Sequence, residues 1–179
     1  MRLFTAINIP EEAKILISSL YEDLKTPFSV KWVRKENLHI TLKFLGKTDK
    51  KTAIEDKMKE ITEEFSSFNV SLKRIGAFPS SKRAKILWVG VEEGRDELIE
   101  LFLTIENKLS PLGFEKEVRK FTPHVTFARV KKGNYSLPEQ IDFSFDSFSV
   151  NEVALFKSTL TPKGPIYETL SLIPLGGKT

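Results

Sequence analysis

One pattern of residues occurs twice in this chain of 179 residues, at a constant distance of 85 positions. The two histidines of the chain open the segments His39-Ile40-Thr41-Leu42 and His124-Val125-Thr126-Phe127. Val33-Arg34-Lys35 recurs as Val118-Arg119-Lys120, and the helix-like apolar spacing before each motif recurs at the same offset. Residues 3–45 and 88–130 therefore share one pattern, which indicates an internal duplication and favours a fold of two related lobes.

The spacing of apolar residues predicts strands with a few amphipathic helices between them. Helices are expected at 11–25, 52–65 and 95–109, and strands at 2–9, 38–45, 69–78, 85–92, 123–130, 146–157 and 166–173. The second lobe has no clear counterpart of the 52–65 helix. This order predicts an α+β fold in which residues 1–179 form one two-lobed domain. We expect two mainly antiparallel sheets with helices on their outer faces and a cleft between the lobes.

The composition excludes several kinds of chemistry. The chain has no cysteine, so it has no disulfide, no thiolate nucleophile and no zinc site built on cysteine. No apolar run approaches the roughly 20 residues of a membrane helix, and the first residues enter a strand pattern directly, so a cytoplasmic protein without membrane contact is expected. The net charge of +4 suits a polyanionic partner. Lys and Arg gather in segments 31–35, 47–51, 82–85, 116–120 and 129–132.

Placing each motif on a strand predicts where its side chains point. Side chains alternate between the two faces of a strand, so His39 and Thr41 share one face and the apolar residues of the motif face the core. If a two-fold axis relates the lobes, His124 and Thr126 line the same cleft. Imidazole titrates near neutrality, so one histidine can act as base and the other as acid. The hydroxyls and nearby cations suit a phosphate on which negative charge develops.

Other kinds of site fit the sequence less well. Two imidazoles without a matched cluster of carboxylates or thiols are few ligands for a metal ion, so no metal site is predicted. The chain has neither a nucleophile elbow for Ser/His/Asp catalysis nor a glycine-rich loop with nucleotide-binding spacing. The acid/base pair is therefore the favoured interpretation.

The paired motifs resemble the HxTx motifs of the two-histidine phosphoesterase superfamily. Within it, the sequence is most similar to the RNA 2′,3′-cyclic phosphodiesterases, also known as 2′-5′ RNA ligases. The similarity extends over essentially the whole chain and includes Arg2-Leu3-Phe4-Thr5-Ala6-Ile7, Leu87-Trp88-Val89-Gly90 and Tyr167-Glu168-Thr169-Leu170.

This resemblance implies a reaction and a set of site residues. Members of the family open a terminal 2′,3′-cyclic phosphate on RNA at the 3′ oxygen and leave a 2′-phosphate; some also form 2′-5′ linkages, and no metal or other cofactor is required. Carried over, His124 is the proton acceptor for the attacking water and His39 is the proton donor to the departing 3′ oxygen. Thr41 and Thr126 hold the non-bridging phosphate oxygens. The implied partner is RNA with a terminal cyclic phosphate, with tRNA fragments among the candidates, bound by a monomeric chain.

Arg129, five residues after His124, resembles a family position that contacts phosphate. Strand alternation points Arg129 away from His124, so this assignment requires the strand to end or bulge before residue 129. The first copy has Phe44 at this position. The cation would then come from one lobe only, which fits unequal roles for the two histidines.

Two other functions would use the same residues. A phosphodiesterase acting on a small cyclic nucleotide or an ADP-ribose cyclic phosphate needs only a different pocket, and a non-catalytic RNA-binding module needs no reaction. Phe78, Trp88 and Phe156 are candidates to stack on a terminal base, with the Lys82-Arg83 loop on the RNA backbone. Strand aromatics more often pack in a core, however. The sequence by itself leaves open which histidine is the acid.

Overall fold

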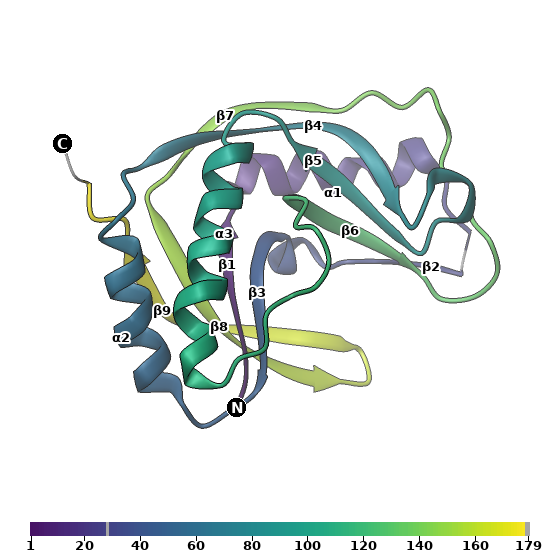
Figure 1. Cartoon of the computed structure of the whole chain (residues 1–179). Coiled ribbons are helices and arrows are strands. Elements are labelled where there is room, and N and C mark those ends of the chain that lie inside the picture. The colour runs from purple at the N-terminus through teal and green to yellow at the C-terminus, as the bar shows by residue number, and fades with distance from the viewer. Residues whose placement is uncertain (28, 178–179) are drawn as a thin grey trace.

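The structure is a computed structural model that describes residues 1–27 and 29–177. Its centre is a nine-stranded antiparallel sheet in the order β7-β4-β5-β6-β3-β1-β8-β9, with β2 paired to β6 (Figure 1). The strands are β1 Arg2–Asn8, β2 Val30–Trp32, β3 His39–Lys47, β4 Phe68–Phe78, β5 Ile86–Val91, β6 His124–Val130, β7 Ser144–Val150, β8 Glu152–Thr161 and β9 Gly164–Pro174. Three short 3-10 turns occupy Lys35–Asn37, Ser81–Arg83 and Ser110–Leu112.

The two halves of the sheet have nearly the same arrangement of strands when each is read from its edge toward the centre: the first strand of each repeat lies beside the motif strand of that repeat. β1 lies between β3 and β8, and β5 lies between β6 and β4. The motif strands β3 and β6 meet in the middle through one antiparallel pair, Ile40 with Val125. The two halves run at a steep angle to each other, so the sheet is curled (Figure 1). The α+β class is confirmed, and the two expected sheets are joined into one along the motif strands.

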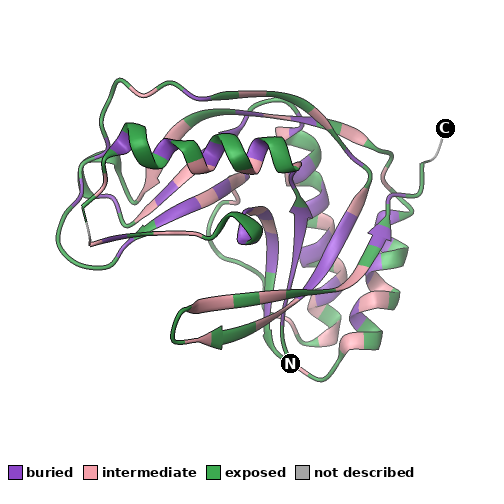
Figure 2. Cartoon of the chain, turned by 180° about the vertical axis from the view of Figure 1, so that it is seen from behind, coloured by how far each residue is buried: buried purple, intermediate pink, exposed green. Residues whose placement is uncertain are grey.

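The helices interlock the two halves around one core. α1 (Glu11–Leu24) lies across the half that contains β5 and β6, whereas α3 (Arg95–Leu109) packs against β3 and beside α2 (Lys51–Thr62) (Figures 1 and 2). Each helix turns a buried stripe toward the sheet, as Figure 2 shows for α1. None of the helices in the described ranges is long and apolar enough to cross a membrane. Because α3 belongs to the second repeat and covers a strand of the first, neither half has a complete core alone.

The expected helices agree closely with the structure, but the C-terminal strands do not. The strand predicted at 146–157 is wrong as a single element, because the chain breaks at Asn151 into β7 and β8. β7 pairs with β4 and β8 pairs with β1, so the two strands lie in opposite halves. Apolar residues occur on both sides of the break, and the pairing partners show that they belong to two strands. The three-residue β2 was missed because so short a strand carries no periodicity.

The offset of 85 residues does not extend to the first strand of each repeat. Ala6 pairs with Thr41 on β3, whereas Trp88 pairs with Thr126 on β6. Equivalent positions on β1 and β5 therefore differ by 82 residues. The connection between strand and helix absorbs the difference of three residues, and Gly94 supplies the left-handed turn (φ 78°) that begins α3. The apolar pattern alone did not reveal this shift.

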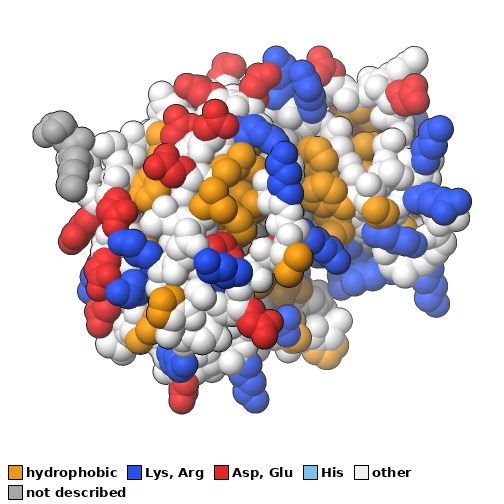
Figure 3. All heavy atoms as spheres, in the orientation of Figure 1, with side chains coloured by type: hydrophobic (Ala, Val, Ile, Leu, Met, Phe, Trp, Pro, Cys, Tyr) orange, Lys and Arg blue, Asp and Glu red, His pale blue; other side chains and the backbone are white. Residues whose placement is uncertain are grey.

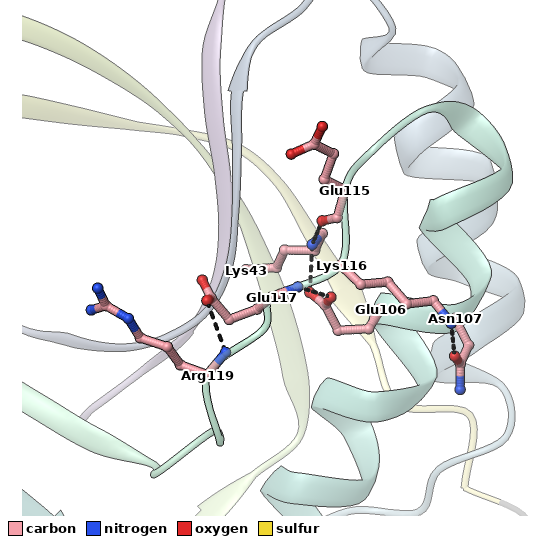
Figure 4. A network of polar contacts seen from close by, with 7 residues as sticks. All are labelled: Lys43, Glu106, Asn107, Glu115, Lys116, Glu117 and Arg119. Atoms are coloured by element: carbon pink, nitrogen blue, oxygen red, sulfur yellow. Dashed lines mark hydrogen bonds and ion pairs between the residues drawn. The ribbon is translucent and has the colours of Figure 1, made fainter.

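A buried ion pair connects the first motif strand to the second repeat. Lys43 on β3 contacts Glu106 on α3, and each side chain is only 5% exposed (Figure 4). The Lys43 ammonium also donates to the Glu115 carbonyl oxygen (2.8 Å), and the other Glu106 carboxylate oxygen accepts from the Glu117 amide (2.6 Å). The last two contacts hold Glu115 and Glu117, which line the cleft, against the buried pair.

Replacing Lys43 alone is expected to destabilise the protein strongly. Lys43→Met leaves the Glu106 carboxylate buried without its cation, which costs about 3–5 kcal/mol in the free energy of unfolding. The double variant Lys43→Met/Glu106→Leu removes both charges and should recover a large part of that loss. Urea unfolding measures the free energy of unfolding of the single and the double variant. If the single variant were as stable as the wild-type protein, the pair would not be buried as described.

Candidate active site

The β3–β6 pairing brings the two motifs to one face of the sheet. With Ile40 opposite Val125, antiparallel register places His39 opposite Thr126 and Thr41 opposite His124. These four residues point away from the core side and line one cleft of about 1240 Å³. The histidines occupy diagonal positions, for which strand geometry gives a spacing of roughly 7–8 Å.

The hydrogen bonds of His39 define its tautomer. Its Nδ1 lies 2.6 Å from the Asn37 carbonyl oxygen, which can only accept, so Nδ1 carries the proton of the neutral ring. Its Nε2 is then an acceptor and receives a hydrogen bond from the Thr41 hydroxyl at 2.8 Å. The lone pair that can take up a proton therefore faces the cleft.

His124 is held in the same way. Its Nδ1 donates to the Thr122 carbonyl oxygen at 2.6 Å, so the neutral ring presents an unprotonated Nε2. Among the described residues, neither this Nε2 nor the Thr126 hydroxyl has a hydrogen-bond partner. The sequence reasoning missed the two orienting carbonyls, because a backbone group carries no side-chain signature.

Burial makes both imidazoles weak bases. The pKa of His39 is lowered to about 4, mainly by desolvation; the hydrogen bond to Asn37 opposes this shift, and the electrostatic influence of Lys14, His124 and Arg129 adds to it. Desolvation also lowers the pKa of His124, with the charge of Arg129 acting in the same direction. Both rings are therefore neutral near pH 7 in the free protein.

A β-bulge turns Arg129 toward the histidines. Leu87 pairs with Ala128 while Trp88 pairs with Thr126, so Phe127 is an extra residue on β6 and the side-chain alternation reverses after it. Phe127 and Ala128 are both buried, and Arg129 is exposed and lines the cleft. The bulge that the sequence argument required is thus present. β3 carries the same bulge at Leu42, so Phe44 lines the cleft from the other half.

Different aromatic rings surround the two histidines. Phe4, Tyr167 and Phe156 lie 5.1, 5.5 and 6.1 Å from the His39 ring, and Phe78 and Trp88 lie 5.2 and 6.1 Å from the His124 ring. Of the three aromatic residues considered for base stacking, only Phe78 lines the cleft. Phe156 is buried against Phe4, and the Trp88 ring lies over Gly76, where a Cβ would come within 2.2 Å of it. These two rings position histidines and are not open to a base.

Cations dominate the rest of the cleft. Ten basic residues line it against three acidic ones, namely Lys31, Arg34, Lys43, Lys85, Lys116, Arg119, Lys120, Arg129, Lys131 and Lys163 against Glu106, Glu115 and Glu117. Figure 3 shows Lys and Arg predominating on the side of β2, β5 and β6, whereas acidic and basic side chains are mixed over α2 and α3. The expected Lys82-Arg83 contact is not supported, because these two residues do not line the cleft. No group of three or more His, Cys, Asp or Glu suited to a metal ion occurs within the described ranges.

Comparison with known proteins identifies what this chain is similar to. A family model described as LigT like Phosphoesterase matches twice, over residues 7–88 and 89–167. The RNA 2′,3′-cyclic phosphodiesterase of Methanocaldococcus jannaschii is 43% identical over 179 residues, which cover 95% of this chain and 98% of that protein. A Thermus thermophilus crystal structure matches with a TM-score of 0.87 at 25% identity over 100% of both chains. The E. coli LigT structure with 3′-AMP matches with a TM-score of 0.80 at 25% identity over 97% of both.

We expect the His39 imidazole to titrate near pH 4 in the free protein, because burial opposes its charged form. Its pKa in the unfolded chain is near 6.5, so the unfolded state binds more protons between these values. The stability that neutral His39 contributes is therefore present above pH 6.5 and is lost as the pH falls toward 4. NMR titration of the imidazole Cε1–H signals measures the pKa, with the His39→Gln variant assigning the signal. A midpoint near 6.5 would contradict the burial of this ring.

Proposed function

The chain belongs to the LigT-like phosphoesterase family and is a phosphodiester hydrolase, and we propose that its substrate is RNA ending in a 2′,3′-cyclic phosphate. Water attacks the phosphorus, the bond from phosphorus to the 3′ oxygen breaks, and the product carries a 2′-phosphate and a 3′-hydroxyl. His124 accepts the proton of the attacking water, and His39 donates a proton to the 3′ oxygen. The observation that carries the proposal is the pair of imidazole Nε2 atoms that face one cleft across the motif strands.

The diagonal placement of the histidines suits an in-line displacement. The attacking and leaving oxygens lie on opposite sides of the phosphorus, so the acid and the base must approach from opposite directions. Thr41 and Thr126, each opposite a histidine, are placed to donate hydrogen bonds to the non-bridging oxygens. Arg129 supplies positive charge to the same oxygens from the second half only.

The unequal surroundings of the rings favour His39 as the acid. An imidazole whose pKa is about 4 is a weak base, but once protonated it is a strong acid toward an alkoxide. The negative charge of the cyclic phosphate, bound beside this desolvated ring, raises the pKa of His39 and allows it to carry the proton. On protonation, Nε2 becomes a donor. The Thr41 hydroxyl, which donates to Nε2 in the free protein, can then turn toward the phosphate.

RNA is favoured over a small cyclic nucleotide by the size and charge of the cleft. Its volume of about 1240 Å³ exceeds the upper range typical of small-ligand pockets, roughly 1,000 Å³. Its basic lining continues well beyond the four motif residues. The name of the Methanocaldococcus relative points to the same substrate. The reverse joining reaction that forms a 2′-5′ linkage, the monomeric state, tRNA fragments as natural substrates, the lack of a cofactor and the cytoplasmic location stay predictions.

Purified protein should release RNA with a 2′-phosphate from a cyclic-ended oligoribonucleotide without added metal. Loss of the acid or the base should lower kcat by about 10²–10⁴-fold in His39→Ala and His124→Ala. A phosphatase-coupled assay with chromatographic product assignment measures this, alongside 2′,3′-cyclic AMP and an ADP-ribose cyclic phosphate. Absence of 2′-phosphate product from RNA at every pH from 5 to 8 would overturn the proposal. RNA binding without turnover would instead favour the non-catalytic module.

Arg129→Met should lower kcat for cyclic-ended RNA by about 10²–10³-fold, because the variant has one donor fewer for the charge that develops on phosphate. Arg129→Lys should recover part of the rate, since it retains the charge but not the planar fork of donors. Lys59→Met on the exposed face of α2 is a matched control, because it removes a cation outside the cleft. Equal activity of Arg129→Met and this control would exclude the assigned role.

A further inference from the structure

The repeated Val-Arg-Lys segment has no role in the reaction described above. Val118-Arg119-Lys120 lies in the loop that leads from the 3-10 turn at Ser110–Leu112 to β6, and all three residues line the cleft. Val118 is 98% exposed, so it adds nothing to the core. Its counterpart Val33-Arg34-Lys35 follows β2 on the other wall.

Buried polar contacts fix the backbone of this loop. At the offset of 85 residues, 115–117 correspond to β2, which is held by strand pairing with β6. Residues 115–117 are held instead by the Lys43 and Glu106 side chains, through the Glu115 carbonyl oxygen and the Glu117 amide (Figure 4). The Glu117 carboxylate then accepts from the Arg119 amide at 3.1 Å. The loop is thus a preformed wall whose position depends on a costly buried pair.

The two arginines of the repeat differ in what they bind. The Arg34 guanidinium donates to the Lys163 carbonyl oxygen (3.4 Å), and Lys35 pairs with Glu11. No described residue accepts a hydrogen bond from the Arg119 guanidinium, which points away from the Glu106 network (Figure 4). The Lys120 ammonium likewise has no partner in the described chain. The backbone of Arg119 is therefore held through its amide, and the charged ends of both side chains are free to bind a ligand.

We propose that Arg119 and Lys120 bind a backbone phosphodiester of the RNA strand that leads to the reacting 3′ end. An arginine guanidinium can donate two parallel hydrogen bonds to a phosphate. The gain in binding free energy is greatest where the backbone that carries the arginine is already ordered. The inference rests on the proposed function and extends it, because the site selects oligoribonucleotides over mononucleotides. A mononucleotide cyclic phosphate contacts the histidines, the threonines and Arg129 but has no second phosphate for this loop.

The test compares two substrates in one variant. In Arg119→Met/Lys120→Met, kcat/KM for a six-nucleotide RNA ending in a 2′,3′-cyclic phosphate should fall at least about tenfold, with the change mainly in KM. Turnover of 2′,3′-cyclic AMP should not change. The salt dependence of oligonucleotide binding should also weaken, by about 0.7 in the log–log slope for each phosphate that the variant no longer neutralises. Lys59→Met is the control, and thermal unfolding checks that both variants fold.

Each other outcome has a definite meaning. Equal decreases on the two substrates would overturn the inference, since the loop would then act on the catalytic residues. An unchanged kcat/KM on the oligonucleotide would overturn it as well. If the wild-type protein opened neither substrate, the proposed function would fail, but fluorescence anisotropy of the same RNA carrying a terminal 2′-phosphate still tests the loop. Weaker binding by the double variant would then support the phosphate site, and equal binding would exclude it.

Discussion

One backbone pair, Ile40 with Val125, joins the two motif strands and determines the geometry of the cleft. It places each histidine opposite the threonine of the other repeat, so every functional pair contains one residue from each half. Strand pairing holds these positions by backbone hydrogen bonds, which do not depend on the side chains that perform the chemistry. Beyond this pair the strands diverge, β2 takes over the pairing with β6, and the space that opens becomes the binding cleft.

The surroundings of the two cleft imidazoles keep both rings neutral near pH 7 in the free protein. Both Nδ1 atoms donate to carbonyl oxygens two residues earlier in the chain, so both rings present the same nitrogen to the cleft. Aromatic packing removes water from them and lowers their pKa values. In the proposed mechanism, the negative charge of a bound phosphate pairs with a protonated imidazole. Burial disfavours that positive charge as long as it has no partner. In the proposed mechanism, substrate binding and protonation of His39 are therefore coupled.

A nearly symmetric scaffold forms an asymmetric cleft because a few equivalent positions differ. Position 44 is phenylalanine where position 129 is arginine, although the same bulge turns both toward the cleft. Position 43 is a buried lysine where position 128 is alanine, and this lysine anchors the loop on the second wall. The two halves therefore offer different surfaces to a single phosphate, one aromatic and one cationic, without any change in the strand framework.

The sequence alone determined the elements with strong local signals: the helices, the motif strands, the α+β class and the side of the strand on which His39 and Thr41 lie. The spacing of apolar residues along the chain indicates these features directly. It also raised the correct condition for Arg129, that a bulge must precede it. Only the tertiary structure decided where β7 ends and β8 begins, the shift of three residues between β1 and β5, and the role of Lys43. Each of these depends on which distant strand or helix a residue meets, and a linear pattern of apolar positions holds no information about that partner.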